Sequence, residues 1–177
     1  MSTDLYPYAR VGVDFAPTDT WDPSIAYGAD GYDARQEDWV GALYPYVDEA
    51  TGARRVLRGV KNTSAAPIAA AKLVATETGE ANIDHVALAD GSTPAVRARG
   101  VTLAQIPVGH CGFVVCQGNV TLTAAGFIAV DAALSCAASG DVDDIAAGAG
   151  LSRHIVGTSL DPGVASAGPF VGYIDVL

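Results

Sequence analysis

The chain has 177 residues, half of them hydrophobic, with ten basic against twenty acidic residues and a formal net charge of −10. This length suits one domain, or one domain with an extension. The acidic balance argues against a nucleic-acid binder, which needs a basic footprint on its surface.

The first fifty residues differ in composition from the rest of the chain. They hold ten acidic against two basic residues, six of the seven Tyr and both Trp. Four prolines and the lack of a sustained period argue against regular structure, but disordered segments are poor in aromatic residues. We therefore predict an extended arm, residues 1–53, that is ordered by packing on something. A long loop folded back on the chain's own β domain is the alternative.

Aromatic and basic side chains make the arm and its boundary a candidate interface with another protein or subunit. Large aromatic residues with a polar group are typical interface anchors. Arg54, Arg55, Arg58 and Lys61 follow the arm and fit either a solvated strand edge or a contact with an acidic neighbour. The predicted interface residues are Tyr6, Tyr8, Trp21, Tyr27, Tyr32, Trp39, Tyr44, Tyr46, Arg54, Arg55 and Arg58.

From residue 54 onward, short β-enriched runs alternate with Gly, Pro and Asp turn signals. This spacing predicts an all-β domain over residues 54–177, a small β-barrel or sandwich. No repeat with a fixed period is evident. In the last run, Phe170, Ile174 and Val176 fall on one face, so we expect the C-terminus to be locked into the sheet. The predicted strands are 54–60, 68–75, 83–88, 95–103, 112–117, 120–123, 127–130, 154–159 and 170–177, and 141–150 is the predicted loop or helical turn.

The thirty residues from Val101 to Val130 contain no Asp, Glu, Lys or Arg. Gly, Pro and Asn break this run into short pieces, whereas a membrane helix needs about 20 consecutive apolar residues. We predict a β-meander with a two-residue hairpin at Gly118-Asn119. Alternation then places Phe113, Val115, Val120, Leu122 and Ala124 on one apolar face, and Val114, Cys116, Thr121 and Thr123 on the other.

The second face of this hairpin is uncharged, where a solvated face would normally carry Lys or Glu. Two explanations remain open. Another subunit covers this face, or the hairpin lies inside an ordinary two-layer sandwich.

Candidate metal ligands and nucleophiles are sparse. Cys111, Cys116 and Cys136 with His110 do not have the four-ligand spacing of structural zinc, so buried, inert thiols are expected. The 30–33 segment falls short of a calcium loop. The start of the chain shows no signal peptide, and the odd cysteine number fits a reducing cytosol. We expect no metal and no cofactor.

A nucleophilic triad from Ser152, His154 and Asp161 is conceivable but lacks the G-x-S-x-G elbow of hydrolases. Paired carboxylates in the arm, such as Glu37-Asp38, do not make an acid–base dyad without a cleft that separates their pKa values. The chain is therefore not expected to be an enzyme. A small hydrolase stays as a minor alternative.

Residues 56–177 resemble small β-barrel decoration (cement) proteins of tailed-phage capsids. The similarity lies in the order of short segments, and the acidic arm has no counterpart in that pattern. These segments are Val60-Lys61-Asn62-Thr63-Ser64 followed by Ile68, Ala98-Arg99-Gly100-Val101 followed by Ile106-Pro107-Val108-Gly109, Gly112-Phe113-Val114-Val115 leading to Gly118-Asn119-Val120, and Ile155-Val156-Gly157-Thr158-Ser159-Leu160 before the terminal Val176-Leu177.

The resemblance implies a non-enzymatic virion protein that is made in the host cytoplasm and bound on the outer capsid surface. Such proteins bridge neighbouring capsomers as oligomers, and a homotrimer suits a three-fold position. The implied partners are the major capsid protein and further copies of the chain, with no nucleic acid and no membrane. A receptor- or glycan-binding fibre or head-fibre module of a phage is the alternative.

Overall fold

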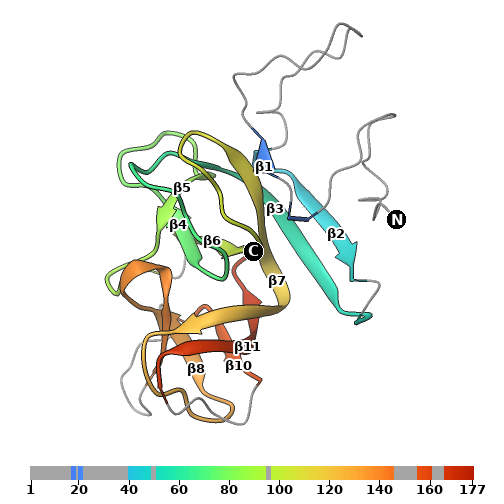
Figure 1. The fold of residues 1–177 in the computed structure, drawn as a ribbon, viewed down its shortest axis with the longest axis vertical. Helices are drawn as coiled ribbons and strands as arrows, with labels where there is room; N and C mark the ends of the chain where they lie inside the picture. The colour runs from blue at the N-terminus through green and yellow to red at the C-terminus, as the bar shows by residue number, and fades with distance from the viewer. Residues whose placement is uncertain are drawn as a thin grey trace, which may run out of the picture.

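The computed structural model describes residues 17–18, 20–21, 40–48, 51–94, 97–145, 155–160 and 166–177. The regular elements among these residues are almost all β-strands, which confirms the predicted all-β class (Figure 1). The strands are β1 Thr20–Trp21, β2 Leu43–Val47, β3 Arg54–Asn62, β4 Leu73–Thr76, β5 His85–Leu88, β6 Ala98–Thr102, β7 Cys111–Ala124, β8 Ala133–Cys136, β9 Val142–Asp144, β10 Gly157–Ser159 and β11 Gly168–Asp175, and a 3₁₀ turn, η3, spans Ala138–Gly140.

Strand β7 runs through the whole sheet and organises it (Figure 1). Its first half pairs with β3 and β6, and its second half pairs with β11. The hydrogen-bonded strand pairs form two closed paths that both start and end at β7. The first runs through β3, β5, β4 and β6. The second runs through β11, β10, β8 and β9. We call β3–β7 the first unit and β7–β11 the second unit. The two share β7 in one sandwich-like sheet, which is not a single closed barrel.

The two units repeat one topology. Replacing β3, β4, β5, β6 and β7 by β7, β8, β9, β10 and β11 reproduces each pairing and its direction, including the parallel pairs β3–β5 and β7–β9. The sequence distance between equivalent positions varies along the repeat. It is 60 residues between the starts of β4 and β8. It is 56 residues between Val86 and Val142, whose carbonyl oxygens accept equivalent backbone hydrogen bonds. This varying offset explains why the sequence shows no fixed period.

The same turn precedes β4, β7 and β8. It begins at a buried Ile, and three residues later the backbone has positive φ, at Ala71 (60°), Gly109 (76°) and Asp131 (54°). Ile68 and Ile106 exchange two backbone hydrogen bonds of 3.0 and 2.8 Å. The turns thereby join the strand ends and carry Ile side chains into the core.

Each unit has aliphatic side chains at equivalent inner positions. Full burial is worth about 1.5–3 kcal/mol for each such side chain. In the first unit they are Val60, Ile68, Val74, Val86, Ile106 and Val114. In the second unit they are Leu122, Ile128, Leu134 and Val142, within a larger cluster that extends into the first unit.

The hairpin predicted at Gly118-Asn119 is wrong, because β7 continues without a turn through both residues. Val56 faces Gln117 while Leu57 faces Val115, so Cys116 is the extra residue of a β-bulge. A bulge shifts the alternation of side chains by one residue. Phe113 and Val115 before the bulge therefore share a core with Val120, Leu122 and Ala124 after it, as predicted, and Cys116 joins this core instead of the opposite face.

Parts of the predicted arm belong to the sheet. Thr20 and Trp21 pair with Gly112 and Cys111 of β7. β2 forms a hairpin with β3, so the predicted boundary after residue 53 falls inside that hairpin. These pieces follow the alternative of a segment folded back on its own domain, and residues 1–16 and 22–39 lie outside the described part.

Several predicted strand positions need correction. Residues 127–130 form one of the Ile turns, and the strand lies just beyond it, as β8. The predicted loop 141–150 contains β9. The final strand, β11, starts two residues before and ends two residues before the predicted bounds of 170–177. Its inner face is as predicted: Phe170, Ile174 and Val176 are buried, and the Val176 N–H donates to Cys116 O over 2.9 Å.

Candidate functional site

The second unit presents an open sheet face. Successive residues of β7 and β11 point alternately into the core and onto this face. Leu122, Phe170 and Ile174 are buried and mark the inner side, so their neighbours lie on the open face. The neighbouring strands β10 and β8 extend it, since Thr158 pairs with both Tyr173 and Ala133. The open face consists of Gln117, Asn119, Thr121, Thr123, Ala133, Ser135, Thr158, Pro169, Val171, Tyr173 and Asp175.

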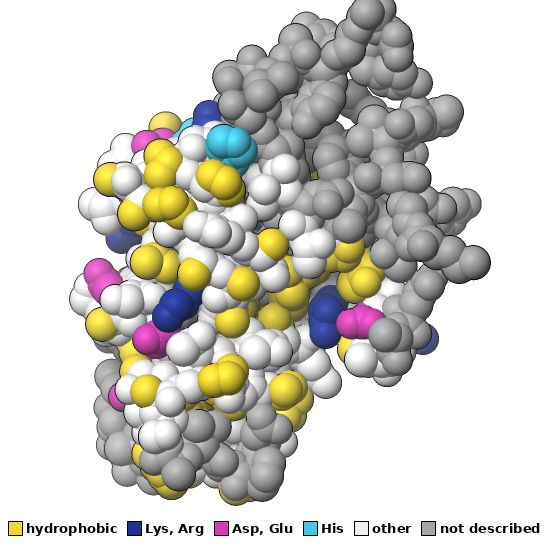
Figure 2. All heavy atoms as spheres, in the orientation of Figure 1, with side chains coloured by type: hydrophobic (Ala, Val, Ile, Leu, Met, Phe, Trp, Pro, Cys, Tyr) yellow, Lys and Arg dark blue, Asp and Glu magenta, His cyan; other side chains and the backbone are white. Residues whose placement is uncertain are grey.

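Asp175 is the one Asp, Glu, Lys or Arg among these residues, and Asp143 of β9, opposite Ser135, adds a second carboxylate at the edge of the face. The face is therefore poor in charge for a chain with a net charge of −10. Val171 lies in the middle of the open face and is 39% exposed. The N–H of Leu160, on the neighbouring chain segment, donates to Val171 O over 3.1 Å. In the view of Figure 2, charged side chains are sparse over the described part of the second unit, at the bottom of the picture. A partly exposed sheet face with few charged side chains is suited to contact with another protein.

The described aromatic residues of the predicted interface lie mostly inside the chain's own fold. Tyr44 is 4% exposed, and its ring meets Phe113 edge-on, with centroids 5.6 Å apart. It is a core residue and not an exposed anchor. Tyr46 is half-buried against the core, and the backbone of Trp21 pairs with β7. Tyr6, Tyr8, Tyr27, Tyr32 and Trp39 lie outside the described residues.

The predicted arginines bind carboxylates and carbonyls of their own chain. Arg54 is exposed. Arg55 pairs with Asp48 over 3.3 Å, and its Nε donates to Asn119 O over 2.7 Å. Arg58 pairs with Asp84 over 3.4 Å. The basic cluster is therefore neither a fully solvated edge nor a wholly free surface for a partner.

Asp84 centres a buried charge cluster. Its side chain is 9% exposed and lies 3.4 Å from the guanidinium of Arg58 and 4.0 Å from that of Arg99. Burial lowers the pKa of Arg99, and Arg58 adds to this effect. A side chain on Gly41 would clash with the Asp84 carboxylate. We assign this cluster to the stability of the first unit.

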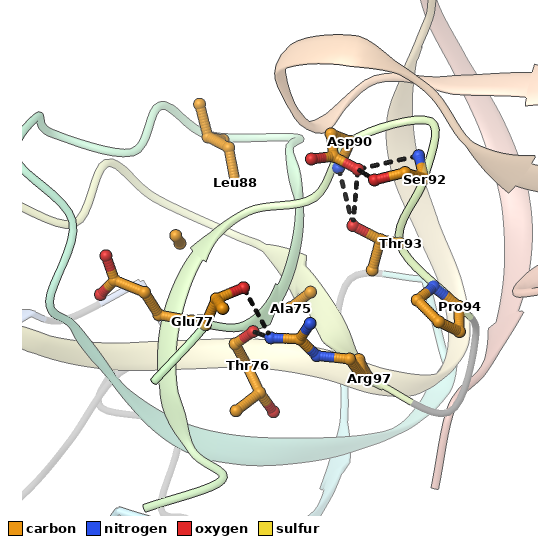
Figure 3. Close-up of a pocket in the computed structure, with 11 residues that line it drawn as sticks. Ala75, Thr76, Glu77, Leu88, Asp90, Ser92, Thr93, Pro94 and Arg97 are labelled. Atoms are coloured by element: carbon orange, nitrogen blue, oxygen red, sulfur yellow. Dashed lines mark hydrogen bonds between the residues drawn. The ribbon is translucent and has the colours of Figure 1, made fainter. Parts of the chain in front are cut away.

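A polar pocket of about 310 Å³ lies between β4, β5 and the loop after β5 (Figure 3). Arg97 Nη2 donates to Thr76 O (2.6 Å) and Thr78 Oγ1 (3.2 Å). Asp90 accepts hydrogen bonds from Ser92 and Thr93, and those from Ser92 contribute most to lowering the Asp90 pKa. The residues that line the pocket thus carry hydroxyl groups, one guanidinium and two carboxylates, those of Glu77 and Asp90.

The cysteines are free thiols, and all three are buried. Burial raises the pKa of Cys116, and it raises the pKa of Cys136 to about 11. Within the described ranges, no three His, Cys, Asp or Glu side chains gather as metal ligands. Ser152, His154 and Asp161 of the considered triad lie outside these ranges. The described residues also contain no helix of the length and apolarity that a membrane span requires.

No protein-family model matches the chain, and no curated protein is significantly similar to it. Among solved structures, the head fibre gp8.5 N base of bacteriophage phi29 aligns with a TM-score of 0.48 and 12% identity. The alignment covers 68% of this chain and 95% of the fibre chain. A likeness at this level carries no argument about function.

Proposed function

We propose that this chain is a structural, non-catalytic protein of a tailed-phage particle, which decorates the outer capsid surface as an oligomer. The open face carries this proposal. An acidic chain that leaves a partly exposed sheet face poor in charge has a surface suited to protein contact. The resemblance of residues 56–177 to decoration proteins supports the capsid as the place of that contact.

In this role the protein would bridge capsomers through many weak contacts that add up because they are linked. The major capsid protein and further copies of the chain, as a homotrimer, are the proposed partners. Arg54 and the aromatic residues of the arm that lie outside the described part, such as Trp39, are the proposed capsid contacts.

Co-sedimentation with heads of the phage that encodes the chain tests this proposal. Purified protein is mixed with expanded heads and, as a control, with tails. We expect saturable binding to heads at a fixed number of copies per head, and none to tails. Protein that stays in the supernatant at every concentration would contradict the proposal.

The pocket between β4 and β5 favours a second candidate, a glycan-binding fibre module. Hydroxyl, guanidinium and carboxylate groups of this kind hydrogen-bond sugar hydroxyls. A glycan array is the test: binding that is lost in Arg97→Ala, together with no affinity for heads, would favour this candidate over decoration.

A further inference from the structure

The counterpart of the open face in the first unit is buried. Thr158 faces Tyr173 between β10 and β11, as Val101 faces Val115 between β6 and β7. The same correspondence between the strands of the two units matches Ala133 with Leu73, Val171 with Phe113 and Asn119 with Leu57. Leu57, Leu73, Val101, Phe113 and Val115 are each at most 2% exposed.

The chain itself covers this face of the first unit. Tyr44 of β2 packs on Phe113. The turn around η3, from the second unit, lies over β4 and β5: the Gly140 N–H donates to Ala89 O over 2.8 Å, and Lys72 pairs with Asp141. In the first unit this face is therefore a packing surface against other parts of the same chain.

Among the described residues, the equivalent face of the second unit is not buried as the face of the first unit is. Asn119, Thr121 and Thr158 are exposed, and Val171 and Tyr173 remain partly exposed. At three of the five matched positions Leu or Val is replaced by a residue with a polar group, in Asn119, Thr158 and Tyr173, while Ala133 and Val171 stay apolar. Such a mixture suits a surface that is solvated before it docks and covered afterwards.

Charge favours a copy of the same chain as the occupant. An acidic partner would be matched by Lys or Arg, which the residues of the open face lack, and a strongly basic partner by more carboxylates than Asp175 and, at the edge, Asp143. Two chains of net charge −10 repel each other, so they approach most easily where each is nearly neutral. The open face meets this condition.

We propose that the open face of the second unit docks a second copy of this chain and so holds the oligomer together. This inference rests on the proposed oligomeric role and names the surface that carries it. The contact takes the place of the cover that β2 and the η3 turn give to the first unit.

Sedimentation velocity of the full chain, with Thr158→Glu and Val171→Glu as variants, tests the inference. A carboxylate in the middle of the contact must be buried unpaired, so we expect the dissociation constant of the oligomer to rise about a hundredfold or more. Ala81→Glu, which adds the same charge at an exposed turn of the first unit, should leave the mass unchanged. A wild-type circular dichroism spectrum and a cooperative thermal transition of the dissociated variants would show that they remain folded, although loss of the contact itself lowers the melting temperature.

A monomeric wild-type protein, or variants that keep the wild-type mass, would overturn the inference. Head co-sedimentation in parallel separates it from the proposed function. A wild-type monomer that binds heads removes the inference and keeps the function. An oligomer that the two variants dissociate, but that does not bind heads, keeps the inference and removes the function.

Discussion

Gly100 on β6 and Gly157 on β10 occupy the same position in the two units. Each pairs with the second residue of a strand, Val74 of β4 or Leu134 of β8. A Cβ on Gly100 would lie 2.5 Å from Val115 O, and one on Gly157 would clash with Tyr173 O. Both units therefore need glycine where β6 or β10 approaches the unit's last strand, β7 or β11.

Gly100→Ala and Gly157→Ala should each destabilise the protein by about 2 kcal/mol or more, because backbone must move to admit the methyl group. Urea unfolding followed by circular dichroism measures the loss. Gly126→Ala is the matched control, since nothing lies within 4 Å of its Cβ position, and it should change stability by less than about 0.5 kcal/mol. Equal effects at all three positions would argue against the shared packing constraint.

Deleting Cys116 should abolish folding, whereas Cys116→Ala should leave a folded protein. The deletion removes the extra residue of the bulge, so Val120, Leu122 and Ala124 would turn away from the core. Cys116→Ala keeps the register and loses one buried thiol, with an expected cost of about 1 kcal/mol. Thermal unfolding of both variants is the measurement, and a cooperative transition in the deletion variant would contradict the bulge.

Asp84→Asn should cost about 3 kcal/mol, because it removes the carboxylate between two poorly exposed guanidinium groups. Asp48→Asn breaks the more exposed pair with Arg55 and should cost at most about 1 kcal/mol. Chemical denaturation distinguishes the two. Similar losses in both variants would mean that Asp84 is not the centre of a buried cluster.

Ionisation of the Cys136 thiol should lower the free energy of unfolding at alkaline pH. Its pKa rises from 9.0 to about 11 on folding, mainly through burial, so the unfolded chain ionises first. The stabilisation is therefore complete below about pH 9 and is lost as the pH rises to about 11. Unfolding at a series of pH values should show a smaller alkaline loss in Cys136→Ala than in the wild type, and an identical loss would contradict this assignment.

Local patterns were enough to predict β structure, but not how the strands meet. The alternation of Phe170, Ile174 and Val176 identified the inner face of the last strand. The Gly118-Asn119 pair resembles a hairpin turn, and only the partners of β7 show that it continues as a strand. One pattern in the sequence did indicate the bulge. The apolar residues change from odd to even positions between Val115 and Val120, and a bulge explains this change as well as a hairpin does.

The candidate site was predicted in part. An uncharged second face on the run was expected, and the part of it formed by Thr121 and Thr123 belongs to the open face. Val171 and Tyr173 were missed, although their alternation with Phe170 and Ile174 could have placed them there. Tyr44 was mistaken for an anchor, because its burial depends on Phe113, sixty-nine positions later in the sequence. The internal repeat is carried by pairings and turns with few shared residues, so it was visible only in the structure.

A cryo-EM reconstruction of the phage particle to which we propose that this chain belongs tests the central claim most directly. We predict density for the two-unit β fold on the outer surface of the head, repeated with the capsid symmetry, with the open faces turned toward neighbouring copies. A head surface without this density, or single copies with open faces exposed to solvent, would contradict the account.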